Sequence, residues 1–349
     1  MNSSSSFTGA TLLGVNVWIG IGAALVALAG AGVVYQLRGA ARDRRTILPP
    51  GRMLSVGTHR LHVVEAGEGE PTVVFEAALG ASSVSWALVQ PEIAKVTRTL
   101  AYDRAGMGFS ESGPEPRTAQ RIVDEMHAVL EAANATKPYL LVGHSYGGMT
   151  CRLFAARYPD EVAGMVLLDP ADPLAWSNPT REQRWKLRAG AMLARRGALI
   201  AQLGIARMTA VLARRGARRS ARVTAAVVSG GILAGRSERI IAPVERVPAE
   251  FRPMLAAFWT QARFYRSLAS QIQHMPESAA QVAATEIPRE MPITVLSASS
   301  LSKTEMDRNV ALASSSRRGR HEMVADSGHW IQLDQPESVV RAITGMVGK

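Results

Sequence analysis

The chain has 349 residues, which is enough for one large α/β domain with an insertion or for two small domains. Apolar residues make up 47% and charged residues 20%, a balance that excludes a wholly disordered or fibrous protein. The net charge is +11, and the single cysteine, Cys151, together with the lack of a Cys/His cluster at zinc spacing, excludes a disulfide scaffold and a structural zinc module.

The first predicted element is an apolar helix. Residues 12–37 carry no charged side chain, and as a helix they can span a hydrocarbon core of about 30 Å. Arginines follow this stretch and no charge precedes it, so we expect residues 1–51 to be a membrane anchor with a basic linker and the rest of the chain to face the cytoplasm. The alternative is a cleaved secretory signal with its site at 27–29 and an exported chain, although a signal would normally carry Lys or Arg before its apolar stretch.

From residue 52 onward, short apolar runs alternate with helical stretches, which predicts a mostly parallel sheet flanked by helices. Helices are expected over 118–133, up to about 158 after the fifth strand, and over 336–347. The stretch 172–288 has no strand suited to the sheet, so we expect a helical cap inserted between core parts 52–171 and 289–349. Strands are expected over 53–58, 59–65, 72–76, 98–102, 139–142, 162–168, 293–298 and 322–325.

The cap sequence holds most of the net charge. Apolar residues are interspersed among its basic residues and no proline interrupts them, so helix is expected. Two interpretations stay open: attraction to an anionic membrane surface, or a solvated helical lid. Stacking aromatic residues are scarce here, which argues against nucleic-acid binding. Only Glu182 opposes the twelve basic residues Arg181, Arg184, Lys186, Arg188, Arg195, Arg196, Arg207, Arg214, Arg215, Arg218, Arg219 and Arg222.

The most specific motif is Gly143-His144-Ser145-Tyr146-Gly147, which lies between a predicted buried strand and a helix. A serine at a tight strand-to-helix turn is held in a strained conformation with its hydroxyl exposed above the sheet, and the two glycines remove side chains that would collide there. The amides that begin the following helix favour developing negative charge. This motif therefore predicts a nucleophilic serine, Ser145.

With this motif, the chain resembles the α/β-hydrolase superfamily over most of residues 52–349. The resemblance also rests on the stretch 102–110 (YDRAGMGFS) and on SGHW at 327–330 with QPE at 335–337, which is similar to the histidine loop of that family. It implies a serine that attacks an acyl carbon, a histidine that carries the proton and an acid that orients the histidine. Members with an aspartate nucleophile, such as epoxide hydrolases and haloalkane dehalogenases, are disfavoured because a serine, Ser145, occupies the nucleophile position at the strand-to-helix turn.

A serine needs an adjacent base, and His329 is the expected one because it lies between the last strand and the terminal helix. His144 neighbours the nucleophile and is expected to point away from it and to pack. Most of the remaining histidines are expected to be ordinary surface or core residues: His59, His62, His127, His274 and His321.

The acid departs from the common pattern of the family, which often places an aspartate just after the strand expected over 293–298. Asp169 instead follows the strand over 162–168, in an Asp-Pro-Ala context similar to that of pancreatic-type lipases. One helix and one strand separate Ser145 from Asp169, which would place both at the carboxyl ends of adjacent strands. Asp169 is therefore the expected acid, and its alternative role is a structural cap on the loop that enters the lid. The alternative acids are Asp172, Glu305 and Asp307.

Acyl transfer also needs donors for an oxyanion. One expected donor is the backbone amide of Tyr146, directly after the nucleophile. Aligned on Trp86, the chain has Ala77-Ala78-Leu79 where the family usually has His-Gly and then the second donor, so the resemblance implies the backbone amide of Leu79. Asp103 and Arg104 are expected to brace the loop after the fourth strand.

The sequence thus predicts a membrane-anchored serine hydrolase that cleaves a small-molecule carboxylic ester through an acyl-enzyme. The expected location beside lipid suggests an amphiphilic or lipid-like ester as the substrate. This chemistry requires no metal or organic cofactor. The membrane is expected to be contacted by the N-terminal helix, with the basic cap as a second contact. Two alternatives stay open: cleavage of an amide, thioester or carbon–carbon bond by the same residues, and a ligand-binding module without turnover.

Overall fold

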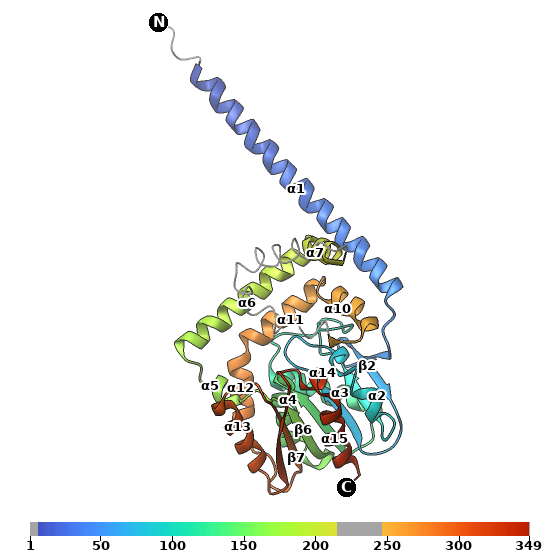
Figure 1. Cartoon of the computed structure of the whole chain (residues 1–349). Coiled ribbons are helices and arrows are strands. Elements are labelled where there is room, and N and C mark those ends of the chain that lie inside the picture. The colour runs from blue at the N-terminus through green and yellow to red at the C-terminus, as the bar shows by residue number, and fades with distance from the viewer. Residues whose placement is uncertain (1–5, 215–245, 349) are drawn as a thin grey trace.

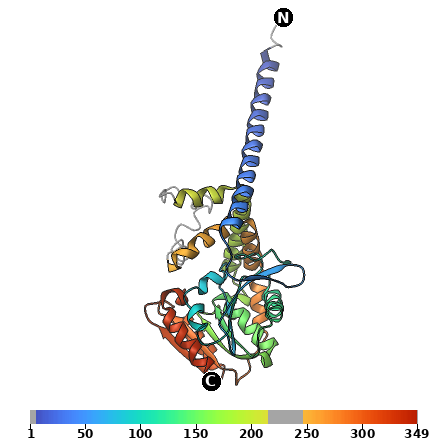
Figure 2. The same ribbon diagram turned by 90° about the vertical axis from the view of Figure 1, so that its right-hand side faces the viewer.

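A long helix and a compact α/β body make up the chain in the computed structural model, which describes residues 6–214 and 246–348. Helix α1 (Ser6–Thr46) projects from the body, and its C-terminal part contacts helices that the chain forms between two strands of the sheet (Figure 1). Among the described helices, α1 is long and apolar enough to cross a membrane, over Asn16–Thr46 (Figure 2). Four arginines of the basic cap sequence lie outside the described residues: Arg215, Arg218, Arg219 and Arg222.

The body is built on one eight-stranded sheet with the order β1-β2-β4-β3-β5-β6-β7-β8. The pairs β1–β2 and β2–β4 are antiparallel, and the pairs from β4 through β3 to β8 are parallel. The predicted fold class, a mostly parallel sheet flanked by helices, is confirmed. The strands are β1 (Arg52–Ser55), β2 (Arg60–Ala66), β3 (Thr72–Glu76), β4 (Thr99–Tyr102), β5 (Tyr139–His144), β6 (Val162–Leu168), β7 (Ile293–Ala298) and β8 (Gly319–Val324).

Two strand boundaries differ clearly from the sequence prediction. Strand β8 begins three residues earlier than expected because it is an edge strand whose first residues, Gly319, Arg320 and His321, are half-buried or exposed and not apolar, so no apolar run marks them. Strand β1 ends at Ser55 because Gly57, with φ of 81°, reverses the chain into β2. The buried central strands fall close to their predicted positions.

Helices cover both faces of the sheet. A second group of helices lies between β6 and β7 along the chain, and we call these the cap helices. The helices around the core are α2 (Gln90–Ile93), α3 (Ala119–Ala132), α4 (Tyr146–Arg157), α13 (Lys303–Ser314), α14 (Ile331–Asp334) and α15 (Pro336–Val347). The cap helices are α5 (Pro173–Ser177), α6 (Arg181–Gln202), α7 (Ile205–Arg214), α10 (Arg252–Phe258), α11 (Ala262–Gln273) and α12 (Met275–Ala283). Short 3-10 turns are η1 (Ser83–Trp86), η2 (Pro159–Glu161) and η3 (Ala249–Phe251). The sequence analysis did not predict α2, α13 and α14.

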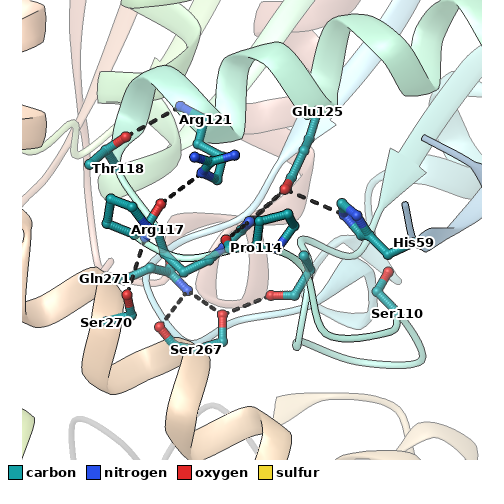
Figure 3. A network of polar contacts seen from close by, with 12 residues as sticks. His59, Ser110, Pro114, Arg117, Thr118, Arg121, Glu125, Ser267, Ser270 and Gln271 are labelled. Carbon is teal, nitrogen blue, oxygen red and sulfur yellow. Dashed lines mark hydrogen bonds and ion pairs between the residues drawn. The ribbon is translucent and has the colours of Figure 1, made fainter. Parts of the chain in front are cut away.

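A buried polar network joins the cap helices to the core (Figure 3). The guanidinium of Arg117 donates two hydrogen bonds of 2.5 Å to the Glu125 carboxylate on α3, and His59 lies 3.3 Å from the same carboxylate. The backbone amide of Arg117 donates to Ser270 on α11, and Ser267 of α11 donates to the Ala105 carbonyl. Because Arg117 and Glu125 are buried and paired, this network fixes where α11 sits over the core.

Candidate active site

Ser145 lies at the sharp turn between β5 and α4. Its backbone has φ of 55° and ψ of −114°, a strained conformation for a residue with a side chain. A Cβ on Gly147 would come within 2.7 Å of the Ala77 carbonyl oxygen, so only glycine allows this close approach. The Ser145 amide donates to the Leu168 carbonyl at 2.9 Å, and its carbonyl accepts from the Ala171 amide at 3.0 Å. The turn is thereby tied on both sides to the end of β6.

Asp169 follows β6 directly, and the structure brings it to His329. The Nδ1 atom of His329 lies 3.2 Å from Asp169 Oδ2, while Asp169 Oδ1 accepts from the Ala298 amide at 2.9 Å. Asp169 itself has φ of 40° and a nearly fully buried side chain. Since a carboxylate only accepts, Nδ1 of His329 is the donor in this bond, and Nε2 is the ring nitrogen that can accept a proton. The imidazole is 46% exposed and therefore accessible from solvent.

His144 supports the histidine loop, a role that the sequence analysis missed. It is buried, as expected for packing, but its Nε2 donates to the His329 carbonyl at 2.7 Å and its Nδ1 accepts from the Gln332 amide at 3.0 Å. Burial, and secondly the neighbouring His329, holds the pKa of His144 well below its usual range, so this ring stays neutral. The only sequence signal was the presence of a polar residue at the end of a buried strand.

The expected oxyanion donors lie on two neighbouring segments. The Tyr146 amide is the first of α4, directly after the turn. Leu79 lies in the loop between β3 and η1, and the carbonyl of its preceding residue, Ala78, accepts a hydrogen bond from Arg104. Because a peptide unit is planar, holding the Ala78 carbonyl also fixes the opposite direction of the Leu79 N–H.

Arg104 is buried and contacts both of these segments. Its Nη1 donates to Glu76 Oε1 at 3.1 Å, and its guanidinium lies 5.3 Å from the centroid of the Tyr146 ring. The sequence analysis assigned Arg104 to the loop after β4, whereas the structure directs it toward the end of β3. Glu76 was the signal in the sequence for such a partner, because its carboxylate lies at the end of a buried and mostly apolar strand.

Asp103, in contrast, braces its own loop as expected. Its carboxylate accepts from His62 Nδ1 at 2.8 Å and from the amides of Ser83 and Phe109. His62 Nε2 also faces the Pro50 carbonyl, so both ring nitrogens face acceptors, which favours the doubly protonated ring. Burial opposes this charge, but the ion pair and hydrogen bond with Asp103 outweigh it and raise the pKa of His62.

The alternative acids have other partners or lie in solvent. Asp172 caps α5 by accepting from the Leu174 amide at 2.9 Å, and it lies 3.4 Å from Arg308. Glu305 completes the capping box at the start of α13 with Ser302. Asp307 is exposed on α13. Within residues 6–214 and 246–348, no group of three or more His, Cys, Asp or Glu side chains is placed to hold a metal ion.

Comparison with known proteins shows the same fold. A family model described as the alpha/beta hydrolase fold matches residues 71–336. The structure of a thermophilic esterase from Thermogutta terrifontis, with malate bound, superposes with a TM-score of 0.59 at 18% identity, covering 84% of this chain and 96% of that one. At this identity the likeness concerns the fold.

Two curated proteins are similar in sequence over part of the chain. The uncharacterized protein YqjL of Bacillus subtilis strain 168 is 42% identical over 105 residues, which are 30% of this chain and 42% of that protein. The 2-hydroxymuconate semialdehyde hydrolase of Pseudomonas sp. strain CF600 is 32% identical over 125 residues, which are 35% of this chain and 44% of that enzyme. The chain therefore spans less than half the length of each of these relatives.

Proposed function

Because the chain belongs to the α/β-hydrolase fold family, we propose that it is a serine hydrolase that cleaves carboxylic esters through an acyl-enzyme intermediate. The observation that carries the proposal is the hydrogen bond of 3.2 Å between Asp169 and His329 Nδ1, at the sheet edge where the strained turn presents Ser145. This bond leaves His329 Nε2 as a base on an exposed ring, which is what a serine nucleophile needs.

In the proposed reaction, Ser145 Oγ forms a bond to the acyl carbon while His329 Nε2 takes the hydroxyl proton. Collapse of the tetrahedral intermediate breaks the bond to the alcohol oxygen, which leaves with that proton. Water then attacks the acyl-enzyme, giving its proton to His329 Nε2, and the bond to Ser145 Oγ breaks with return of the proton to the serine. Asp169 stays a carboxylate throughout and stabilises the imidazolium.

The backbone amides of Leu79 and Tyr146 are the proposed donors to the oxyanion. Both belong to segments that Arg104 contacts, so their directions are set before substrate arrives. Such preorganised donors cost no reorganisation as charge develops, and each contributes roughly 3–4 kcal/mol to lowering the barrier.

We further propose that α1 spans a membrane once and that the hydrolase body lies on the cytoplasmic side. The length and apolar composition of α1 support the span, and the arginines that follow it support the orientation. An enzyme held at a bilayer would meet amphiphilic esters at high local concentration, which makes them the expected substrate class.

A carbon–carbon bond hydrolase is the second candidate. It is favoured by the similarity of 32% over 125 residues to the 2-hydroxymuconate semialdehyde hydrolase. The same serine, histidine and aspartate could serve either reaction, so the two candidates differ in substrate rather than in these residues.

The deciding experiment assays purified full-length protein in detergent against p-nitrophenyl esters of increasing acyl length and against a dienoate, 2-hydroxymuconate semialdehyde. We expect ester turnover that is lost in Ser145→Ala and kept in the matched control Ser314→Ala, an exposed serine on α13. Turnover of the dienoate alone would favour the second candidate. Ester turnover that survives Ser145→Ala would refute the proposal.

A further inference from the structure

The outer face of α6 carries an exposed apolar stripe. Trp185, Met192 and Leu199 are 65%, 48% and 57% exposed, and their spacing of seven residues places them in one line along the helix. Most apolar side chains of this size are buried in the core of the body, so a line of three on one helix indicates a surface that is covered.

The inner face of α6 shows which way the stripe points. Its buried residues are small: Ala191, Ala194, Gly197, Ala198 and Ala201. A Cβ on Gly197 would come within 2.6 Å of the Tyr265 ring of α11, so α6 lies close against α11 through this face. Because the helix turns 100° per residue, the stripe lies on the side opposite α11 and the core.

Exposed cations flank the stripe. Five arginines lie within about a quarter-turn of it on the helical wheel: Arg181, Arg184, Arg188, Arg195 and Arg196. Glu182 is the one acid of α6, and it pairs with Lys186 rather than with these arginines. The outer face of α6 is therefore apolar along its centre and positive at its sides.

A buried polar cluster fixes the start of α7, just beyond α6, against α1. Arg207 is 8% exposed, and its guanidinium lies 2.7 Å from Asp43 and donates to Gln36 at 3.0 Å and to Thr260 at 3.0 Å. Gln36 in turn donates to the Thr260 carbonyl at 2.8 Å. The junction of α6 and α7 is thus held at the C-terminal end of the apolar stretch of α1.

Close backbone approach strengthens this contact. Gly32 and Gly39 lie on the same face of α1 as Gln36, each about one turn from it, on opposite sides along the helix. A Cβ on Gly32 would collide with the Leu203 carbonyl, and a Cβ on Gly39 would collide with the Arg207 side chain. Helix α1 is therefore packed into the cap helices rather than joined to the body only by its linker.

The arrangement places α6 at the level where α1 would leave a bilayer. Figure 1 shows α6 crossing the direction of α1, with the free part of α1 on one side of α6 and the core on the other. In Figure 2, α7 extends sideways from α1, at a steep angle to it. The stripe faces away from the core, toward the side from which α1 projects.

We propose that the outer face of α6 is a membrane-binding surface, with Trp185, Met192 and Leu199 inserted among the headgroups of an anionic bilayer and the flanking arginines on lipid phosphates. The inference rests on the proposed membrane span of α1. Interfacial helices of this kind bury their apolar face about 5–10 Å into the boundary between headgroups and acyl chains, and basic residues near an anionic surface add attraction. The cap helices then contact the bilayer through α1 and along α6, and the core lies on the side of them that faces away from the bilayer.

The test compares three single-cysteine labels in proteoliposomes that contain phosphatidylcholine with or without phosphatidylglycerol. Met192→Cys reports on the stripe, Met323→Cys is the matched exposed methionine on edge strand β8, and Val26→Cys reports on the span. The buried Cys151 makes the unsubstituted chain a labelling blank. Each cysteine carries an NBD fluorophore, and nitroxide-labelled lipid is the quencher.

We expect lipid nitroxide to quench NBD at Met192→Cys several-fold more than at Met323→Cys, and more strongly with phosphatidylglycerol. Reversal of charge in Arg188→Glu/Arg195→Glu/Arg196→Glu should remove the extra quenching due to phosphatidylglycerol. Equal quenching at Met192→Cys and Met323→Cys with strong quenching at Val26→Cys would overturn this inference alone. No quenching at Val26→Cys would overturn the span and the inference together. Oxidative cross-linking of two Met192→Cys chains without lipid quenching would assign the stripe to a second copy and also overturn it.

Discussion

Replacing Asp169 by asparagine should abolish hydrolysis while leaving the fold nearly unchanged. Asparagine keeps an oxygen for the Ala298 amide, which now donates to Asp169 Oδ1 at 2.9 Å. Its NH2 group replaces the oxygen that faces His329 Nδ1 at 3.2 Å. That amide can only donate to Nδ1, so the ring proton moves to Nε2, which can then no longer take the proton of Ser145.

The expected size follows from the loss of the productive tautomer. Removing the acid in this way lowers kcat about 10⁴-fold in a serine triad, which corresponds to about 5.5 kcal/mol of barrier. Stability should change little because the bond to Ala298 survives. Asp169→Ala should behave differently, since it leaves the buried Ala298 N–H without an acceptor and costs about 1–3 kcal/mol of folding free energy.

The assay pairs kcat for a p-nitrophenyl ester with the free energy of unfolding for Asp169→Asn, Asp169→Ala and the control Asp307→Asn. Asp307 is exposed on α13, so its variant should keep both activity and stability. The reasoning is refuted if Asp169→Asn retains kcat within about tenfold of the original chain, far from the loss a triad predicts. It is also refuted if Asp307→Asn alone abolishes turnover.

Three further predictions concern residues around the site and in the core. Arg104→Lys keeps the charge but cannot contact both segments that carry the proposed oxyanion donors, so kcat should fall by up to about 10²–10³-fold with KM nearly unchanged. A rise in KM of that size, with kcat unchanged, would contradict this role. Arg117→Met removes the guanidinium from the buried Glu125 carboxylate, which then has only His59 beside it, at 3.3 Å. The free energy of unfolding in urea should fall by about 3–5 kcal/mol, whereas a loss below about 1 kcal/mol would show that the pair is not buried in solution. In the folded chain, Asp103 raises the pKa of His62 against the opposing effect of burial. The contribution of protonated His62 to stability is therefore fully present below its unfolded pKa of about 6.5, and it is lost as the pH rises through the folded pKa. The free energy of unfolding should therefore fall above pH ~6.5 more steeply in the original chain than in His62→Gln, and equal slopes would contradict the cationic ring.

The sequence predicted those features that depend on order along the chain. The sharp turn at Ser145 could be predicted because a buried strand and Gly143 precede it and Gly147 and a helix follow it. Asp169 and His329 could be placed because Asp169 directly follows β6 and His329 lies in the loop after β8, and the carboxyl ends of these parallel strands meet the same edge of the sheet. Their mutual hydrogen bond is a consequence of that shared edge.

The supports of the site could not be predicted in this way. The contact of His144 with Gln332 joins residues 188 positions apart, and Arg104 turns from its own loop toward β3. Such contacts are set by packing between layers, and no local pattern records them. Only a polar residue in an apolar strand, as at Glu76, signals that a partner exists.

The cap sequence shows a second reason for incomplete prediction. On a helical wheel Arg207 falls on the same side as Ile200 and Leu203 and makes the amphipathic pattern look poor. The structure gives this arginine a partner, Gln36, 171 positions earlier in the chain, on the helix taken as a free anchor. The exposed stripe of α6 was equally hidden among its arginines until the buried face was known.

Covalent labelling of Ser145 tests the central claim most directly. Folded full-length protein in detergent is treated with a fluorophosphonate, and the modified peptide is identified by mass spectrometry. The account predicts one adduct, on Ser145, that forms in the original chain and is absent in Ser145→Ala and in heat-unfolded protein. No adduct on folded protein, or an adduct that persists in Ser145→Ala, would contradict it.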